Sequence, residues 1–321
     1  MNIIFMGTPH FAVASLDILL KNNYNVIAVV TNPDKPSGRG QKLAVSPLKQ
    51  FAIDNNIPIL QPEKLNDEGF IATVKELNPD LQIVVAFKKL PKVLWQLPAL
   101  GTFNLHASLL PDYRGAAPMN WAIINGETET GLTTFFLNDN IDEGKILLSK
   151  EILIDTDWSL GELHDEMMVK GAELVLKTVK AIENQKITPI DQLALISNDS
   201  VIKKAPKIFK EHCRINWDHK SKDIVNLIRG LSPIPTAFTE LLSLKDDSNI
   251  YYLKVFKAMS EVSFHSFSTG KILTDNKTFL KISTTDGFVH LIDIQLAGKK
   301  RMNIYDFLRG FNIGDNFEVI K

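Results

Sequence analysis

The chain has 321 residues, which is too long for one ordinary hydrophobic core and predicts two domains. With 45% hydrophobic and 23% charged residues and a mean hydropathy of −0.01, the composition excludes a disordered or membrane-embedded chain. The formal net charge is −1, but residues 207–321 hold 17 basic against 13 acidic residues, and residues 1–206 hold 19 against 24. The mildly basic later part permits a polyanionic partner without requiring one.

The single cysteine, Cys213, excludes a disulfide within the chain, and no Cys-x-x-Cys or His-rich cluster indicates a metal site. We therefore expect no metal. The first residues run directly into an apolar strand without the features of a targeting segment, and no stretch of about 18 apolar residues could span a bilayer. These features predict a cytoplasmic protein.

Residues 1–86 alternate apolar runs of strand length with patterns of helical period. Strands are predicted over residues 2–6, 26–30 and 81–86, and helices over 11–20, 48–54 and 65–77. Continuous apolar strands separated by helices indicate a Rossmann-like, doubly wound and mostly parallel sheet. The glycine of Gly7-Thr8-Pro9 could bring backbone amides close to phosphate, but G-x-G-x-x-G is absent and Pro9 lacks an N–H. A structural turn is favoured there over a dinucleotide site.

Residues 31–42 form a long predicted loop between a strand and a helix. Loops of this length in compact domains are usually functional or disordered. Arg39, between Gly38 and Gly40, could reach a phosphate or stack on a base. A solvated surface loop remains the alternative.

Polar residues gather at two predicted strand ends. Asn104 and His106 lie two apart in a strand, so they share one face. A lone histidine in such a place is more often a buried structural residue, but the neighbouring asparagine shifts the interpretation towards a site. Asp142 follows the apolar run 133–137, in a turn that ends in glycine. A carboxylate there suits turn chemistry as well as catalysis, and spacing alone does not pair it with His106.

A helix is predicted over residues 159–183, and the sequence pattern changes after it. Residues 185–206 lack sustained periodicity and are predicted to be a linker. Four short strands follow, over residues 250–258, 270–274, 278–283 and 287–295, separated by turn residues that favour a small OB-like barrel. The predicted domains are thus 1–184, catalytic and Rossmann-like, and 207–321, a β-barrel.

Seven segments of the chain carry a resemblance to a known family: residues 4–9, 31–42, 104–111, 114–118, 142–144, 205–207 and 297–302. In these segments the sequence resembles the methionyl-tRNA formyltransferase family, and the resemblance covers nearly the whole chain. The Asn-x-His and Ser-Leu-Leu-Pro elements occur across folate-dependent formyltransferases, whereas the Gly-Arg-Gly loop and the Ala-Gly-Lys-Lys-Arg-Met element point to the tRNA enzymes.

The resemblance implies 10-formyltetrahydrofolate as the donor and the methionine α-amino group of initiator tRNA as the acceptor. It implies that Asn104 donates a hydrogen bond to the developing oxyanion. His106 would supply a second donor or move the proton, and Asp142 would orient the imidazole or relay a proton through water. The general base stays open among His106, Asp142 and a bound water.

The same resemblance assigns binding residues and a monomeric state. The folate would contact Ser108, Leu109, Leu110 and Pro111, together with Phe87, Lys88 and Leu90. The family commonly has Ala-Tyr-Gly before its Leu-Pro, so Phe87 replaces a tyrosine here and Lys88 a glycine. Contacts to tRNA would come from Lys35, Arg39, Lys42, Lys299, Lys300 and Arg301.

Two other functions compete with this interpretation. A folate-dependent formyltransferase acting on an amino sugar or a ribonucleotide amine would share the Asn-x-His element but would need no basic second domain. A non-catalytic RNA-binding module would use the Rossmann-like half only as a scaffold.

Overall fold

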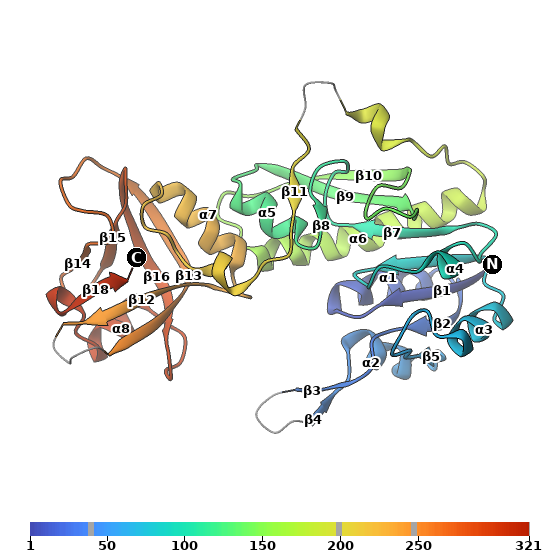
Figure 1. Cartoon of the computed structure of the whole chain (residues 1–321), viewed down its shortest axis with the longest axis horizontal. Helices are drawn as coiled ribbons and strands as arrows, with labels where there is room; N and C mark the ends of the chain where they lie inside the picture. Colours follow the sequence, from blue (N-terminus) through green and yellow to red (C-terminus); the bar gives the residue numbers. More distant parts are fainter. Residues whose placement is uncertain (38–41, 197–200, 245–248, 321) are drawn as a thin grey trace. The chain divides into compact units, whose positions relative to one another are not determined.

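The computed structural model describes residues 1–37, 42–196, 201–244 and 249–320, with the backbone alone at residues 36, 37, 42, 43 and 315. The chain divides into two compact units (Figure 1). Unit 1 contains Met1–Pro118, Glu129–Leu153 and His164–Ala205; unit 2 contains Met119–Thr128, Ile154–Leu163 and Pro206–Lys321. No helix of the described chain is both long enough and apolar enough to cross a membrane.

Unit 1 is built on a seven-stranded sheet with the strand order β10-β9-β7-β6-β1-β2-β5 (Figure 1). Five neighbouring strands are parallel, and β9 and β10 add an antiparallel edge. This sheet confirms the predicted Rossmann-like, mostly parallel fold. The strands are β1 (Asn2–Gly7), β2 (Asn25–Val30), β5 (Ile59–Leu60), β6 (Leu81–Val85), β7 (Thr102–His106), β9 (Glu129–Phe136) and β10 (Ile146–Leu153).

Helices cover both faces of this sheet. Ser46 caps one helix by accepting a hydrogen bond from Lys49 N, and Asp67 caps another through Phe70 N. One hydrophobic cluster joins two of the helices, α3 and α4, to β1, β2 and β6. The helices of unit 1 are α1 (His10–Lys21), α2 (Pro47–Asp54), α3 (Glu68–Glu76), α4 (Lys92–Trp95) and most of α6 (Leu160–Glu183).

The glycine turn after β1 is explained by close packing. A Cβ atom on Gly7 would lie 2.7 Å from Ala12 Cβ and 2.8 Å from Val85 O, so only glycine lets α1 and β6 approach this closely. The prediction of a loop over residues 31–42 was wrong at residues 35–37 and 42, which lie in strands. There β3 (Lys35–Ser37) pairs with β4 (Lys42–Ala44) in an antiparallel ladder that satisfies backbone groups.

Unit 2 is built on an antiparallel sheet with the order β14-β15-β16-β13-β12-β18, and β17 pairs with β16. The edge strands β14 and β18 approach each other, so the sheet is nearly a barrel. All four predicted strands of this region are present, which confirms the expected fold class. The elements are α5 (Pro118–Ile124), α7 (Ser221–Leu231), β12 (Ala237–Ser243), β13 (Ile250–Val262), β14 (Ile272–Thr274), β15 (Leu280–Ser283), β16 (Gly287–Leu296), β17 (Met302–Asn303), α8 (Ile304–Gly310) and β18 (Phe317–Ile320).

Candidate active site

Asn104 and His106 stand at the carboxyl end of β7, near the middle of the unit 1 sheet. Their orientation follows from the packing of Leu105 between them. A Cβ atom on Gly171 of α6 would lie 2.9 Å from Leu105 Cδ2, so Leu105 faces that helix. Because side chains alternate along a strand, Asn104 and His106 point to the opposite face. The carboxyl ends of parallel strands are where open α/β sheets place their ligand sites.

The His106 imidazole is buried, with 6% of the residue exposed, and both of its nitrogens face defined groups. Its Nε2 lies 2.9 Å from the carbonyl oxygen of Tyr113. A carbonyl only accepts hydrogen bonds, so Nε2 carries a hydrogen and donates. The other nitrogen, Nδ1, lies 3.9 Å from Asp142 Oδ2. That separation is too long for a direct hydrogen bond but short enough for a strong attraction once the ring is charged.

Asp142 is held in its place by the neighbouring backbone. It adopts φ = +55°, and its Oδ2 accepts a hydrogen bond of 3.0 Å from Gly115 N. Aspartate tolerates this left-handed conformation better than most residues. The structure therefore brings Asp142 to His106, a pairing that spacing could not predict.

The segment that supplies Gly115 is fastened by a distant part of the chain. Here β8 (Arg114–Gly115) pairs in parallel with β11 (Lys204–Ala205). Tyr113 N also donates to Lys203 O at 2.6 Å. A Cβ atom on Gly115 would lie only 2.4 Å from Ala205 O, so glycine is required for this approach. Residues 203–205 thus position both the carbonyl that holds His106 and the N–H that holds Asp142.

The turn that follows β7 is rigidly hydrogen-bonded. Ser108 is fully buried, and its hydroxyl donates to Asp112 O at 2.6 Å. Thr133 Oγ1 donates to Ser108 O and accepts from Leu110 N. The bond between Leu110 and Pro111 is cis. The result is a fixed turn whose shape is set by β7 and β9.

The residues after β6 emerge at the same sheet edge, because β6 and β7 are parallel neighbours. Phe87 packs against the α3–α4 cluster, and Leu90 is buried within it. Lys88 is exposed, and the Lys89 ammonium donates to Asp139 O at 2.9 Å. Of the predicted folate contacts in this segment, Lys88 is thus the accessible side chain and Leu90 a core residue.

The predicted basic contacts have different surroundings. Lys35 is exposed on β3; Arg39 lies outside the described residues, as does the side chain of Lys42. Lys299 and Lys300 are exposed.

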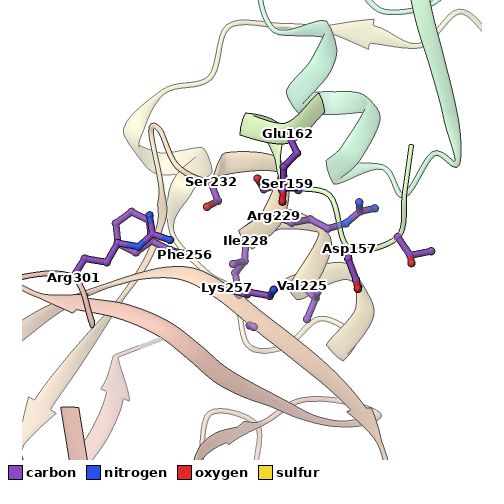
Figure 2. Close-up of a pocket in the computed structure, with 12 residues that line it drawn as sticks. Asp157, Ser159, Glu162, Val225, Ile228, Arg229, Ser232, Phe256, Lys257 and Arg301 are labelled. Carbon is purple, nitrogen blue, oxygen red and sulfur yellow. Dashed lines mark hydrogen bonds between the residues drawn. The ribbon is translucent and has the colours of Figure 1, made fainter. Parts of the chain in front are cut away.

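The remaining predicted contact, Arg301, lies over the Phe256 ring, 4.2 Å from its centroid, and pairs with Asp293 at 2.6 Å. Arg301 lines a hollow of about 200 Å³ in unit 2 (Figure 2). Arg229 and Lys257 add two further cations to its lining. Burial lowers the pKa of Arg229 below its usual value, and the charge of Asp157 opposes that shift. The hollow therefore mixes cations with carboxylates.

The sequence did not indicate the groups that support His106 and Asp142. Tyr113 acts through its carbonyl and Gly115 through its N–H, and backbone contacts leave no side-chain signature. Arg114 donates to Glu143 at 3.1 Å and to Gln192 at 2.6 Å. The glycine in the Arg114-Gly115 pair was the available signal, since it indicates a close backbone approach. Nothing in the polar stretch around Gln192 singled that residue out.

Comparisons with known proteins agree along the whole chain. Residues 1–179 match the family described as Formyl transferase, and residues 207–312 match Formyl transferase, C-terminal domain. A methionyl-tRNA formyltransferase of Phocaeicola vulgatus is 51% identical over 321 residues, which is 99% of this chain and 98% of the relative. The Flavobacterium johnsoniae protein of the same name is 50% identical over 319 residues, 99% of each.

Solved structures share the fold at lower identity. WlaRD, a sugar 3N-formyl transferase solved in the presence of dTDP and 5-N-formyl-THF, has a TM-score of 0.63 and 23% identity, covering 94% of this chain and 99% of its own. HypX from Aquifex aeolicus, in complex with tetrahydrofolic acid, has a TM-score of 0.61 and 17% identity, covering 100% of this chain and 51% of its own. At these identities the likeness concerns the fold.

Proposed function

Because this chain belongs to the methionyl-tRNA formyltransferase family, we propose that Asn104, His106 and Asp142 catalyse its transfer of a formyl group to methionyl initiator tRNA. The donor of that group is folate-derived, and we take it to be 10-formyltetrahydrofolate. The observation that carries the site assignment is the approach of Asp142 to His106 at the carboxyl edge of the sheet. We expect the enzyme to act as a cytoplasmic monomer.

The reaction makes one C–N bond and breaks another. The neutral α-amine of methionine attacks the formyl carbon, and the bond from that carbon to N10 of the folate breaks. One proton leaves the amine and one is delivered to N10, so the exchange is balanced without an oxidant or reductant. The protein must stabilise the oxyanion that develops on the formyl oxygen and must move the proton.

His106 is suited to moving the proton through Nδ1. Its Nε2 hydrogen is committed to Tyr113 O, so in the neutral ring Nδ1 holds the free lone pair. When Nδ1 takes the amine proton, the imidazolium lies 3.9 Å from the Asp142 carboxylate, which stabilises the charge. Asp142 itself accepts the Gly115 N–H, which keeps the carboxylate oriented toward the ring.

Asn104 is suited to binding the oxyanion. It lies on the same face of β7 as His106, and it is half-buried. Among the residues that the structure describes, no protein group forms a hydrogen bond with its side chain. Its amide N–H groups are therefore available to a substrate oxygen, and a preorganised donor of this kind is worth about 100- to 1000-fold in rate.

We place the folate against the turn Ser108–Pro111 and the residues that follow β6. The turn is fixed by Thr133 and by the Ser108 hydroxyl, so its backbone groups can read a planar ring by shape. Phe87 and Lys88, which follow the neighbouring strand, complete the proposed folate contacts, whereas the buried Leu90 belongs to the hydrophobic cluster on which Phe87 packs. Lys88 contributes an exposed ammonium at this edge.

We place tRNA phosphates against the exposed lysines Lys299 and Lys300 and against Arg301, and we assign further contacts to Lys35, Arg39 and Lys42. The stacked and ion-paired Arg301 presents a guanidinium in a fixed direction, which suits a phosphate better than a mobile lysine does. Lys257 and Arg229 line the same hollow, and the carboxylates of Asp157 and Glu162 in its lining partly offset their charge (Figure 2).

The acceptor is tested by offering purified protein and 10-formyltetrahydrofolate three substrates: methionyl initiator tRNA, methionyl elongator tRNA and a nucleotide-linked amino sugar. We expect formylmethionine on the initiator tRNA, little on the elongator tRNA and none on the sugar. Formylation of the sugar alone would replace this proposal with a small-amine formyltransferase. A protein that binds tRNA but transfers nothing would be a binding module.

A further inference from the structure

The segment between α6 and β11 contains a short helix whose burial pattern is reversed. In η1 (Gln192–Leu195), Leu193 is 74% and Leu195 is 51% exposed, whereas Gln192 is only 1% exposed. Apolar burial therefore does not hold this helix in place. A buried amide must be hydrogen-bonded to offset the loss of hydration, so the partners of Gln192 explain why the segment lies where it does.

The Gln192 amide uses its full hydrogen-bonding capacity at the candidate active site. Its Nε2 donates to Asp142 O at 2.9 Å and to Gly144 O at 2.8 Å. Its Oε1 accepts from Arg114 Nε at 3.0 Å and from Arg114 Nη2 at 2.6 Å. Arginine can only donate and carbonyls can only accept, so these partners fix which end of the amide is which. One side chain thus joins the turn that carries Asp142 to the residue before Gly115.

Both ends of this connection matter for the orientation of the Asp142 carboxylate. Gly115 N supplies its hydrogen bond, and the left-handed backbone at Asp142 directs the side chain toward His106. Gln192 binds the backbone carbonyls of Asp142 and Gly144 on one side of that hydrogen bond, and the Arg114 side chain next to Gly115 on the other. The segment is itself anchored upstream, where Ile190 and Ile146 exchange two backbone hydrogen bonds of 2.8 Å. The predicted linker therefore contributes a buried, fully bonded side chain to unit 1.

We propose that Gln192 is a positioning residue for formyl transfer, holding Asp142 at the distance from His106 that the charged imidazole requires. This inference rests on the proposed function of Asp142 and extends it to a residue outside the Asn-x-His element. In this assignment the Gln192 side chain contacts neither the folate nor the tRNA. Its loss should therefore slow the chemical step without weakening binding, because small displacements of a catalytic group lower rate by up to about 100-fold.

The test compares Gln192→Met with a matched control, Gln82→Met. Gln82 is also a fully buried glutamine of unit 1, but its side chain contacts Thr102 and not the site. Methionine keeps the volume and removes every hydrogen bond of the amide. For Gln192→Met we expect kcat to fall about 10- to 100-fold with KM for tRNA and folate within about twofold of wild type. The control should keep the wild-type kcat.

Two further variants assign the effect to the Asp142 turn. Gln192→Glu keeps an acceptor for Arg114 but presents a carboxylate to the carbonyls of Asp142 and Gly144, so it should be as slow as Gln192→Met. Adding Gln192→Met to Asp142→Asn should cost no more than Asp142→Asn alone, because residues acting as a unit are not additive. A wild-type rate in Gln192→Glu, or additive losses in the double variant, would overturn the proposal.

Hydrogen exchange separates this inference from the proposed function. In Gln192→Met, peptides covering residues 138–146 should exchange faster than in wild type, while those covering β6 should not change. A wild-type protein that formylates no tRNA would refute the proposed function. The exchange result would still test whether Gln192 holds the Asp142 turn in place. If the wild type is active and Gln192→Met has the same kcat and the same exchange as wild type, only the positioning role of Gln192 would be refuted.

Discussion

Replacing Gly115 by alanine should damage the site through one methyl group. Gly115 has φ = +127°, and the new Cβ would lie 2.4 Å from Ala205 O, so β8 must move away from β11. Backbone strain of this kind costs about 1–3 kcal/mol. The movement also breaks the hydrogen bond from Gly115 N to Asp142, and a bond to a charged group is worth about 1.5–3 kcal/mol. Together these terms give a loss of roughly 2.5–6 kcal/mol.

This loss is measurable by thermal unfolding and by formyl transfer. About 2–4 °C per kcal/mol for a unit of this size predicts a Tm lowered by roughly 5–24 °C. The kcat should fall about 100-fold, since Asp142 loses its orienting donor. Gly298→Ala is the matched control for stability, because Gly298 has φ = +79° with open space around its Cβ position. If Gly115→Ala unfolds no earlier than Gly298→Ala and keeps its activity, the close approach of β8 and β11 is not what holds the site.

Three other variants test the proton transfer by His106, the charge of Glu261 and the proposed tRNA contacts. His106→Ala should lower kcat by about 100- to 10,000-fold at unchanged folate affinity, because proton transfer is lost; a smaller effect would move that role to Asp142 or water. Glu261 should lose stabilising charge as pH falls, since hydrogen bonds from His290 and then Lys281 hold its pKa below the usual value. A group with a depressed folded pKa stabilises above its unfolded pKa of 4.5, and this stability is lost as pH falls through the folded pKa. Thermal scans below pH 5 should therefore show a smaller acid-induced loss in Glu261→Gln than in wild type, and equal losses would contradict the assignment. Replacing Lys299, Lys300 and Arg301 together by alanine should reduce the slope of log K for tRNA binding against log salt concentration by about 3. An unchanged slope would exclude these three residues from the tRNA contacts.

The sequence predicted the scaffold well because the scaffold depends on periodic burial. Apolar strands separated by amphipathic helices determine a parallel sheet, and the short strands of the later region were recognised from their turns. The segment 31–42 was harder to predict, because pairing between Lys35–Ser37 and Lys42–Ala44 depends on backbone hydrogen bonds and not on an apolar pattern. The residues at the centre of that segment lie outside those described.

The site was predictable only in part. Asn104 and His106 share a strand, so their common face follows from a period of two. Asp142 reaches His106 through a turn held by Gly115, and Gln192 reaches Asp142 from 50 residues further along the chain. Contacts between distant loops depend on tertiary packing, so no local pattern predicts them. The reversed burial of Gln192 and its leucine neighbours becomes visible only in the folded chain.

The role of Asn104 at the end of β7 is tested by the single-turnover rate of formyl transfer to methionyl initiator tRNA. With saturating folate donor and tRNA, Asn104→Ala should transfer about 100- to 1000-fold more slowly than wild type, because a preorganised oxyanion donor is lost. Its affinity for both substrates should stay within about threefold, since the lost interaction belongs to the transition state. An Asn104→Ala protein that transfers formyl at the wild-type rate would contradict the account.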